Sequence, residues 1–134
     1  MNKFSQKSLE RLNTCHPILI NIFTEVLKIM DITILEGYRN KFAQNKAYDR
    51  GYSQLRYPRS KHNQKPSVAI DVAPYPIDWE NTDRFFYLAG LVQGISASYE
   101  TKIRWGGDWD SDNDFNDQSF NDYPHFEIKD IPYL

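Results

Sequence analysis

Three short segments of the sequence carry side chains that could together bind a metal ion. The first ends at His62 in a polar stretch, the second is Asp71 nine residues later, and the third runs from Asp122 to His125. Two histidines and one carboxylate are a common ligand set for catalytic zinc, with the fourth position left to water. Asp71 stands among apolar neighbours, where an unpaired carboxylate is costly, so it should be paired or hold a metal. A surface histidine and a turn aspartate are the alternative interpretation of the same residues.

A hydrolytic centre of this kind also needs a proton acceptor near the metal and a positive partner for the oxyanion that develops. Asp122, three residues before His125, can reach the same side of the metal, accept a proton from water and hand it to a leaving amine. Arg39, after the first predicted strand, is the candidate for the oxyanion partner. The sequence contains no HExxH, GxSxG, P-loop or GxGxxG motif that would favour another chemistry.

A run of alternating aspartates follows a Gly-Gly pair and resembles the start of a calcium loop. Its members are Asp108, Asp110, Asp112 and Asp114. The run lacks the glycine and the glutamate that an EF-hand has at its sixth and twelfth positions. We therefore expect a solvated acidic loop from Asp108 to Asp117, with a loose second cation site as the alternative.

Apolar spacing predicts the elements that must position these side chains. The predicted helices are Ser5–Leu12, a helix from Pro17 that Asp31 ends, Ala43–Arg50 closed by Gly51, and Thr82–Ser98. The predicted strands are Ile32–Leu35, Ser67–Ala73, Ile103–Trp105 and His125–Ile128. In the second helix, Ile18, Ile22, Val26 and Ile29 form the expected buried face. Helices and strands mix without regular βαβ alternation, which favours an α+β fold in one domain over residues 1–134.

Composition excludes several classes of protein. The net charge of −2 argues against a general nucleic-acid binder, and the single cysteine, Cys15, excludes an internal disulfide framework. Cys15 should lie in the core, and His16 should start a helix or lie at the surface. Residues 39–65 carry eight Lys/Arg and one acid, whereas residues 108–130 carry eight acids and one base. The simpler interpretation is two solvated loops that attract each other; the alternative is a cleft whose walls differ in sign.

The sequence shows no secretory or membrane signal. No apolar run in the first residues is long enough for a secretory signal, and the apolar stretch from Ile18 to Leu35 is interrupted by polar side chains. We therefore expect cytoplasmic synthesis without a signal peptide, and no membrane insertion.

Taken together, the motifs resemble those of the M15 zinc peptidases, and most of all the short phage-type members. The matching segments are Phe4–Leu12, Glu36–Arg39, Gln44, Ser60–Asn63, Pro66–Asp71, Pro74–Trp79, Trp105–Trp109, Asp117-Gln118 and Asp122–Glu127. The family pattern S-x-H, A-x-D and [DE]-x-x-H falls on Ser60, His62, Ala69, Asp71, Asp122 and His125. The fold that this resemblance implies is a small antiparallel sheet backed by helices with a zinc cleft, of the hedgehog/DD-peptidase-like kind.

The resemblance also implies a role for each matching side chain. His62, Asp71 and His125 would bind zinc, Asp122 would be the general base, and Arg39 would polarise the scissile carbonyl. Ser60 and Gln44 would line or support the substrate cleft. Glu127 shares a strand face with His125 and would either orient that ligand or serve as a structural acceptor. Trp79, Trp105 and Trp109 are candidates to line the cleft or to pack beneath it, and we favour packing for Trp79.

The activity implied is hydrolysis of an amide bond in the peptidoglycan stem peptide. We favour an L-alanyl-D-glutamate endopeptidase that acts on the cell wall as an endolysin, as a monomer, after release by a holin-type partner. A D-alanyl-D-alanine carboxypeptidase is the alternative within the family. A non-catalytic zinc-containing module that binds cell wall or forms part of a virion is the alternative from another class.

Overall fold

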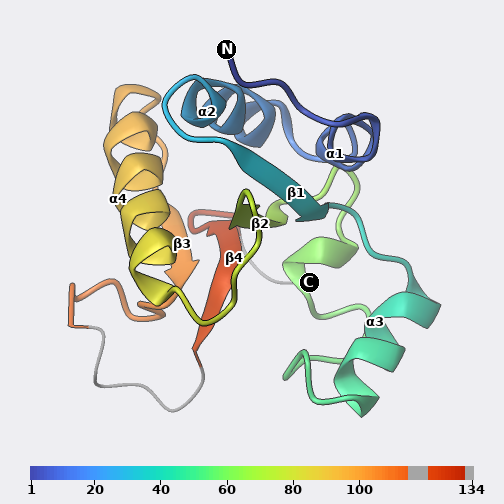
Figure 1. The fold of residues 1–134 in the computed structure, drawn as a ribbon. Helices are drawn as coiled ribbons and strands as arrows, with labels where there is room; N and C mark the ends of the chain where they lie inside the picture. The colour runs from blue at the N-terminus through green and yellow to red at the C-terminus, as the bar shows by residue number, and fades with distance from the viewer. Residues whose placement is uncertain (115–120, 132–134) are drawn as a thin grey trace.

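Among residues 1–114 and 121–131, which the computed structural model describes, four antiparallel strands form one sheet in the order β1-β2-β4-β3 (Figure 1). The strands are β1 (Ile32–Glu36), β2 (Ala69–Pro74), β3 (Ile103–Gly106) and β4 (Asp122–Ile128). The helices are α1 (Gln6–Leu12), α2 (Pro17–Leu27), α3 (Lys41–Asp49) and α4 (Thr82–Ser98), and a 3-10 helix, η1, spans Lys61–Asn63. This arrangement confirms the predicted α+β class and the antiparallel sheet backed by helices.

One face of the sheet carries the apolar side chains of the core. Side chains alternate between the two faces along a strand, so Ile70 and Val72 of β2 share this face with Phe126 of β4. Helix α4 contacts β2, β3 and β4, and the ring of Phe23 in α2 lies 5.5 Å from the ring of Phe126. Helices α2 and α4 therefore cover the apolar face, and removal of this apolar surface from water is the main force that stabilises the fold.

Helix α2 begins where the sequence predicts and ends earlier. Pro17 occupies its first turn, and the backbone N–H of Ile18 donates to Nδ1 of His16, which confirms His16 as a helix-start residue. The helix stops at Leu27, because the next backbone N–H groups turn back to Glu25 and Val26 in a tighter turn. Ile29 consequently lies outside the helix with 56% of its surface exposed, so its predicted burial is wrong.

The other predicted elements agree with the structure within a few residues. Cys15 is buried in the core, as predicted. Helix α3 starts two residues before its predicted start because the side chain of Asn40 accepts a hydrogen bond from the N–H of Ala43. Gly51 follows this helix with a φ of 79°, a left-handed conformation that glycine adopts without strain.

The predictions for the acidic segment and for membrane insertion can be compared with the structure only over the described residues. The acidic segment is described as far as Asp114, and Asp117 and Gln118 lie outside the described residues. Within the described parts of the chain, none of the helices combines the length and the apolar character needed to span a membrane.

Candidate metal centre

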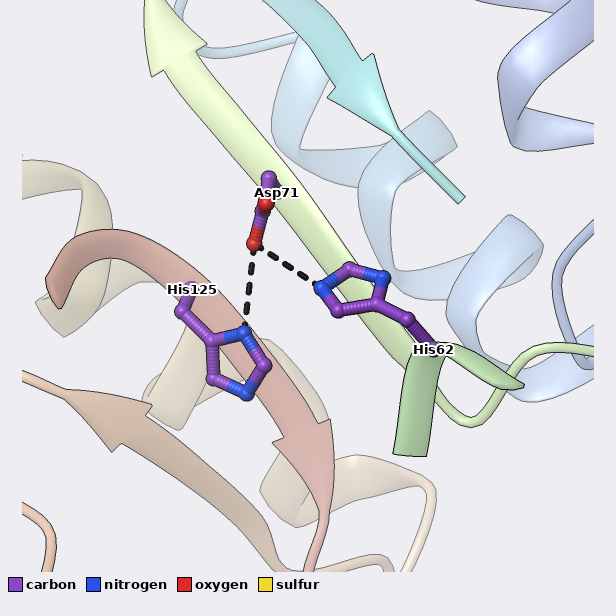
Figure 2. Close-up of side chains that lie close together, drawn as sticks. All are labelled: His62, Asp71 and His125. Carbon is purple, nitrogen blue, oxygen red and sulfur yellow. Dashed lines mark hydrogen bonds and ion pairs between the residues drawn. The ribbon is translucent and has the colours of Figure 1, made fainter. Parts of the chain in front are cut away.

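Strands β2 and β4 bring two of the predicted ligands face to face. Their antiparallel register pairs Asp71 with His125, on the face of the sheet opposite the apolar core. The third predicted ligand, His62, lies in η1 and reaches Asp71 from the side (Figure 2). Nε2 of His62 and Nδ1 of His125 each lie 3.2 Å from the same oxygen of Asp71, Oδ1. The three side chains thus offer one ligand atom each, all within 4.8 Å of one another.

The outward-facing ring nitrogens of both histidines are held by fixed acceptors. Nδ1 of His62 lies 2.7 Å from the carbonyl oxygen of Gly37, and Nε2 of His125 lies 2.8 Å from Oε1 of Glu127. When these nitrogens carry the protons and donate, the inward nitrogens, which face Asp71, are left with their lone pairs. This is the arrangement that orients histidine ligands around a metal.

The charges of the group also fit a cation. Burial alone would raise the pKa of the Asp71 carboxyl, but the adjacent charge of His62 and the hydrogen bond to His125 hold it well below its usual range. Burial opposes a charge on His125, yet its hydrogen bonds to Asp71 and Glu127 raise its pKa to about 10, because the two carboxylates favour a positive charge at this position. A bound metal ion would supply that charge in place of the proton on the inward nitrogen. Two imidazole nitrogens and a carboxylate suit zinc, so these residues fit the predicted metal.

A buried ion cluster supports His125 from behind. Glu127 is 2% exposed, and its Oε2 lies 3.3 Å from Nζ of Lys61 and 3.6 Å from Nε of Arg104. Lys61 also donates to the carbonyl oxygen of Ile128 at 2.6 Å. Burial lowers the pKa of Lys61, and the charge of Glu127 opposes that effect. The two cations offset the charge of Glu127 while it accepts from His125, a contact that favours ligand orientation over a purely structural role.

Lys61 was missed by the sequence analysis. A lysine in a polar, basic segment is normally solvated, yet this one is 2% exposed. No local signal in the sequence marks this burial, because it depends on the contact between Lys61 and Ile128 at the far end of β4.

Asp122 opens β4 and lines the same cleft as the three ligand candidates. It is half-buried. Burial and the nearby charge of Asp71 raise the pKa of Asp122 to about 6, although the histidines and Arg39 oppose the shift. A carboxyl group that titrates near neutrality beside a metal site is suited to accept and return a proton.

Arg39 extends from the end of β1 to the ligand group. Its Nε lies 2.9 Å from Oε1 of Glu36, its Nη1 2.9 Å from Oε1 of Gln44, and its Nη2 3.5 Å from Oδ2 of Asp71. The Arg39 backbone is fixed as well, because its N–H donates to the carbonyl oxygen of His62 at 2.8 Å. The guanidinium is therefore held in place on the cleft wall, next to the ligands.

Gln44 lies behind Arg39 and has no exposed surface. Its amide nitrogen donates to Oγ of Ser53 at 2.9 Å and to the carbonyl oxygen of Leu55 at 2.6 Å, while its oxygen accepts from Arg39. The side chain thus ties α3 and the loop after it to the arginine.

Ser60 holds the backbone that carries His62. It caps η1, with its Oγ accepting from the N–H of His62 at 3.2 Å, and the side chain of Asn63 accepts from the N–H of Ser60 in return. Ser60 is 5% exposed and contributes to the cleft wall.

An open cleft of about 1280 Å³ contains these groups, and aromatic side chains form part of its lining. The ring of Trp109 lies 5.3 Å from that of His125. Trp79 is 56% exposed and stacks on Phe85 at 5.5 Å, so the expectation that it packs in the core is wrong. It follows a strand that ends at Pro74 and precedes α4, where the chain runs over the surface. Trp105 instead is 3% exposed and packs in the core.

A second group of carboxylates lies at the start of the acidic loop. Ligand atoms of Asp108, Asp110 and Asp112 lie within 4.8 Å of one another. Asp108 is only 7% exposed, so the expectation of a fully solvated loop is wrong at this residue. Burial raises its pKa, although its Oδ2 accepts from the N–H of Asn113 at 2.9 Å.

The chain is similar to known L-alanyl-D-glutamate peptidases. A family model described as phage L-alanyl-D-glutamate peptidase matches residues 1–129. The chain is 32% identical over 123 residues to the L-alanyl-D-glutamate peptidase of Escherichia phage T5, covering 87% of this chain and 88% of that protein. It is also similar to the crystal structure of the L-Ala D-Glu endopeptidase ChiX of Serratia marcescens, with a TM-score of 0.74 and 25% identity over 95% of this chain and 90% of that one.

Proposed function

The chain belongs to the phage L-alanyl-D-glutamate peptidase family, and from that premise we propose that it is a zinc peptidase of the cell wall. Its substrate is the stem peptide of peptidoglycan, and the bond cleaved is the amide between L-alanine and D-glutamate. The observation that carries the proposal is the convergence of His62, Asp71 and His125 beside Asp122 in one cleft.

The residues of the chain divide the work of amide hydrolysis among them. Zinc held by the three ligands would supply a Lewis acid at an open coordination position. Asp122 accepts the proton of the attacking water and returns it to the leaving amine, for which a pKa of about 6 is well matched. Arg39 donates from its guanidinium to the oxygen of the scissile carbonyl as negative charge develops there.

Two further residues keep this machinery in position. Gln44 holds the Arg39 side chain from within the protein, and Ser60 fixes the backbone of His62 from the cleft wall. We assign both a supporting role, and Ser60 alone of the two can also touch substrate, since Gln44 has no exposed surface.

Two alternatives receive less support. A D-alanyl-D-alanine carboxypeptidase would use the same metal group, but the family model and both relatives bear the name of the endopeptidase. A non-catalytic zinc module would have no use for a half-buried aspartate with a raised pKa beside the ligands.

The phage family also suggests where the protein acts. We propose that it degrades the cell wall as an endolysin, after release by a holin-type partner that permeabilises the membrane. Zinc, rather than another divalent ion, is proposed from the ligand chemistry.

Digestion of purified peptidoglycan tests the enzyme assignment. The zinc-loaded protein should release new amino groups, the chelated protein should release none, and addition of zinc should restore the activity. His125→Ala should be inactive. His16→Ala, which removes a histidine at the start of α2 outside the cleft, is the matched control and should remain active. A fully zinc-loaded parent that releases no amino groups would overturn the proposal and favour the binding module.

A further inference from the structure

The cleft has two sides of different chemistry. Trp79 and Phe85 contribute aromatic surface near the start of α4, whereas Lys46, Arg50 and Arg59 contribute cations from α3 and the loop that follows it. Helices α3 and α4 lie on opposite sides of β4 in Figure 1. We call the group Lys46, Arg50 and Arg59 the cationic wall.

In the part of the chain that the structure describes, no carboxylate forms an ion pair with the cationic wall. The only acid between residues 39 and 65 is Asp49, whose Oδ1 lies 3.5 Å from Nη2 of Arg56, outside the cleft. Within residues 1–114 and 121–131, no carboxylate lies within ion-pair distance of Arg50 or Arg59. Lys46 lies over the ring of Phe42 at 5.8 Å, a contact that leaves its charge in place. Among the described residues, these three positive charges therefore line the cleft without forming an ion pair.

The acids of the cleft lie elsewhere and are already engaged. Glu36 pairs with Arg39, Glu127 pairs with Lys61, and Asp71 faces the two histidines. A substrate carboxylate is repelled by Asp122 and attracted by the cationic wall, so the field of the cleft fixes the direction in which an acidic peptide lies.

The proposed substrate also carries its free negative charge on only one side of the scissile bond. A glutamate linked through its amine has two carboxyl groups, and the stem peptide can continue from only one of them, so the other is free. The alanine on the other side of the scissile bond has no free carboxylate. Guanidinium groups bind carboxylates through paired, charge-assisted hydrogen bonds, which makes arginine the appropriate residue for this contact.

We propose that the cationic wall is a carboxylate-binding subsite for the D-glutamate half of the stem peptide, the half that leaves as the amine. This inference rests on the proposed function. Arg50 and Arg59 are its specificity-determining residues, and the enzyme should distinguish a free carboxylate on D-glutamate from a carboxamide of almost the same size.

Two synthetic stem peptides that differ only in this group test the subsite. One carries D-glutamate with its free carboxylate, and the other carries the carboxamide at the same carbon. The zinc-loaded enzyme should cleave the carboxylate peptide with a kcat/KM about 10-fold or more above that of the carboxamide, the range expected for a hydrogen bond to a charged group. The double variant Arg50→Gln/Arg59→Gln should lose this preference.

Arg56→Gln is the matched control for the change in charge. Arg56 belongs to the same basic segment but does not line the cleft, so this variant should keep the preference for the carboxylate peptide. Equal cleavage of the two peptides by the parent, or a preference that survives in the double variant, would overturn the subsite and leave the proposed function intact.

A binding measurement separates the two proposals. Asp122→Asn removes the proton acceptor and leaves the cationic wall unchanged, so calorimetry with this zinc-loaded variant should show tighter binding of the carboxylate peptide. Carboxylate-dependent binding to a parent that cleaves neither peptide would contradict the proposed function and retain the subsite. Equal binding of both peptides would contradict the subsite.

Discussion

At the scale of single residues, Asp122 combines position and charge state in the way that a proton acceptor requires. Its pKa is raised to about 6 by burial and by the charge of Asp71. A general base works in its deprotonated form, so kcat/KM for a stem peptide should rise as the pH increases through about 6 and fall below it. Measurement of kcat/KM across this range checks the prediction, and an activity that increases toward acid pH would contradict it.

Substitution of Asp122 separates catalysis from metal binding. Asp122→Asn should lower kcat by roughly 100- to 10,000-fold, the usual contribution of a general base, while the zinc affinity stays close to that of the parent. Asp122→Glu keeps a carboxylate and should retain part of the activity. A zinc-loaded Asp122→Asn variant as active as the parent would show that another group accepts the proton.

Glu127 holds His125, one of the proposed metal ligands, through a hydrogen bond. Glu127→Gln keeps the shape of the side chain but weakens the acceptor at Nε2 of His125, now at 2.8 Å, and leaves Lys61 without its counter-charge. Loss of such a supporting contact typically lowers metal affinity by about 10- to 100-fold. Competition with a chelating indicator measures this affinity. Glu80→Gln, an exposed glutamate outside the cleft, is the control, and equal zinc affinity in all three proteins would contradict the role of Glu127.

The sequence identifies the residues of the proposed metal site more readily than the buried contacts that hold those residues in place. His62, Asp71, His125 and Asp122 belong to short motifs, and the structure brings all four into one cleft. The burial of Lys61 could not be predicted, because it depends on a contact with Ile128 of β4, 67 residues further along the chain. The same holds for Gln44, because its side chain forms hydrogen bonds with Arg39, with Ser53 and Leu55, and with Asn63, which lie in three other segments.

At the scale of elements, the register between β2 and β4 decides the geometry of the site. The register pairs Asp71 with His125, which brings two proposed ligands together. The next pair on the same face of the sheet is Ala69 and Glu127, and it places the Glu127 carboxylate beside His125. A shift of β4 by one residue would turn His125 toward the apolar core and leave Asp71 without it. The strands themselves follow from alternating side chains in the sequence, whereas the pairing of two strands more than fifty residues apart does not.

Gly106 sets the position of Asp122 through close backbone contact. The two residues pair across β3 and β4 at an irregularity, and a Cβ at position 106 would collide with the carbonyl group of Asp122. Gly106→Ala should therefore displace Asp122 and reduce activity at least 10-fold, while zinc binding by the ligands is largely retained. Kinetics and zinc titration of one preparation check both parts.

Gly94→Ala provides the matched control for this substitution. Gly94 lies in α4 with open space around it, where alanine favours the helix by about 0.5–1 kcal/mol. This variant should be fully active and at least as stable as the parent. Equal activity of Gly106→Ala and Gly94→Ala would contradict the role assigned to Gly106.

At the scale of the whole molecule, the two faces of the sheet have separate tasks. The face packed against α2 and α4 holds the core, and the other face carries Asp71 and His125, two of the proposed metal ligands. Because a metal bound only by the folded chain stabilises it, chelation should lower the melting temperature without unfolding the protein at room temperature. Thermal unfolding with chelator and after zinc addition measures the shift, and an identical melting temperature in both states would contradict a metal site at these residues.

The charge pattern also acquires a meaning only in the folded chain. The net charge of −2 gives no sign of a charged cleft, and the basic segment from residue 39 to residue 65 could have been a solvated loop. Five of its eight cations, Arg39, Lys46, Arg50, Arg59 and Lys61, instead line the cleft, and Asp122 and Glu127 of the acidic segment line it as well, which favours the alternative of a cleft whose walls differ in sign. Sequence composition reveals such a segment, but its position relative to His62 and His125 depends on how α3 packs.

Mass spectrometry of peptidoglycan fragments tests the central claim most directly. Fragments from digestion with the zinc-loaded protein are compared with those from Asp122→Asn, and the new terminus in each is identified. The proposed activity predicts peptides that begin with D-glutamate, together with glycan strands that keep L-alanine, from the parent alone. Release of free D-alanine with the rest of the stem peptide intact, or fragments identical to those of an undigested sample, would contradict it.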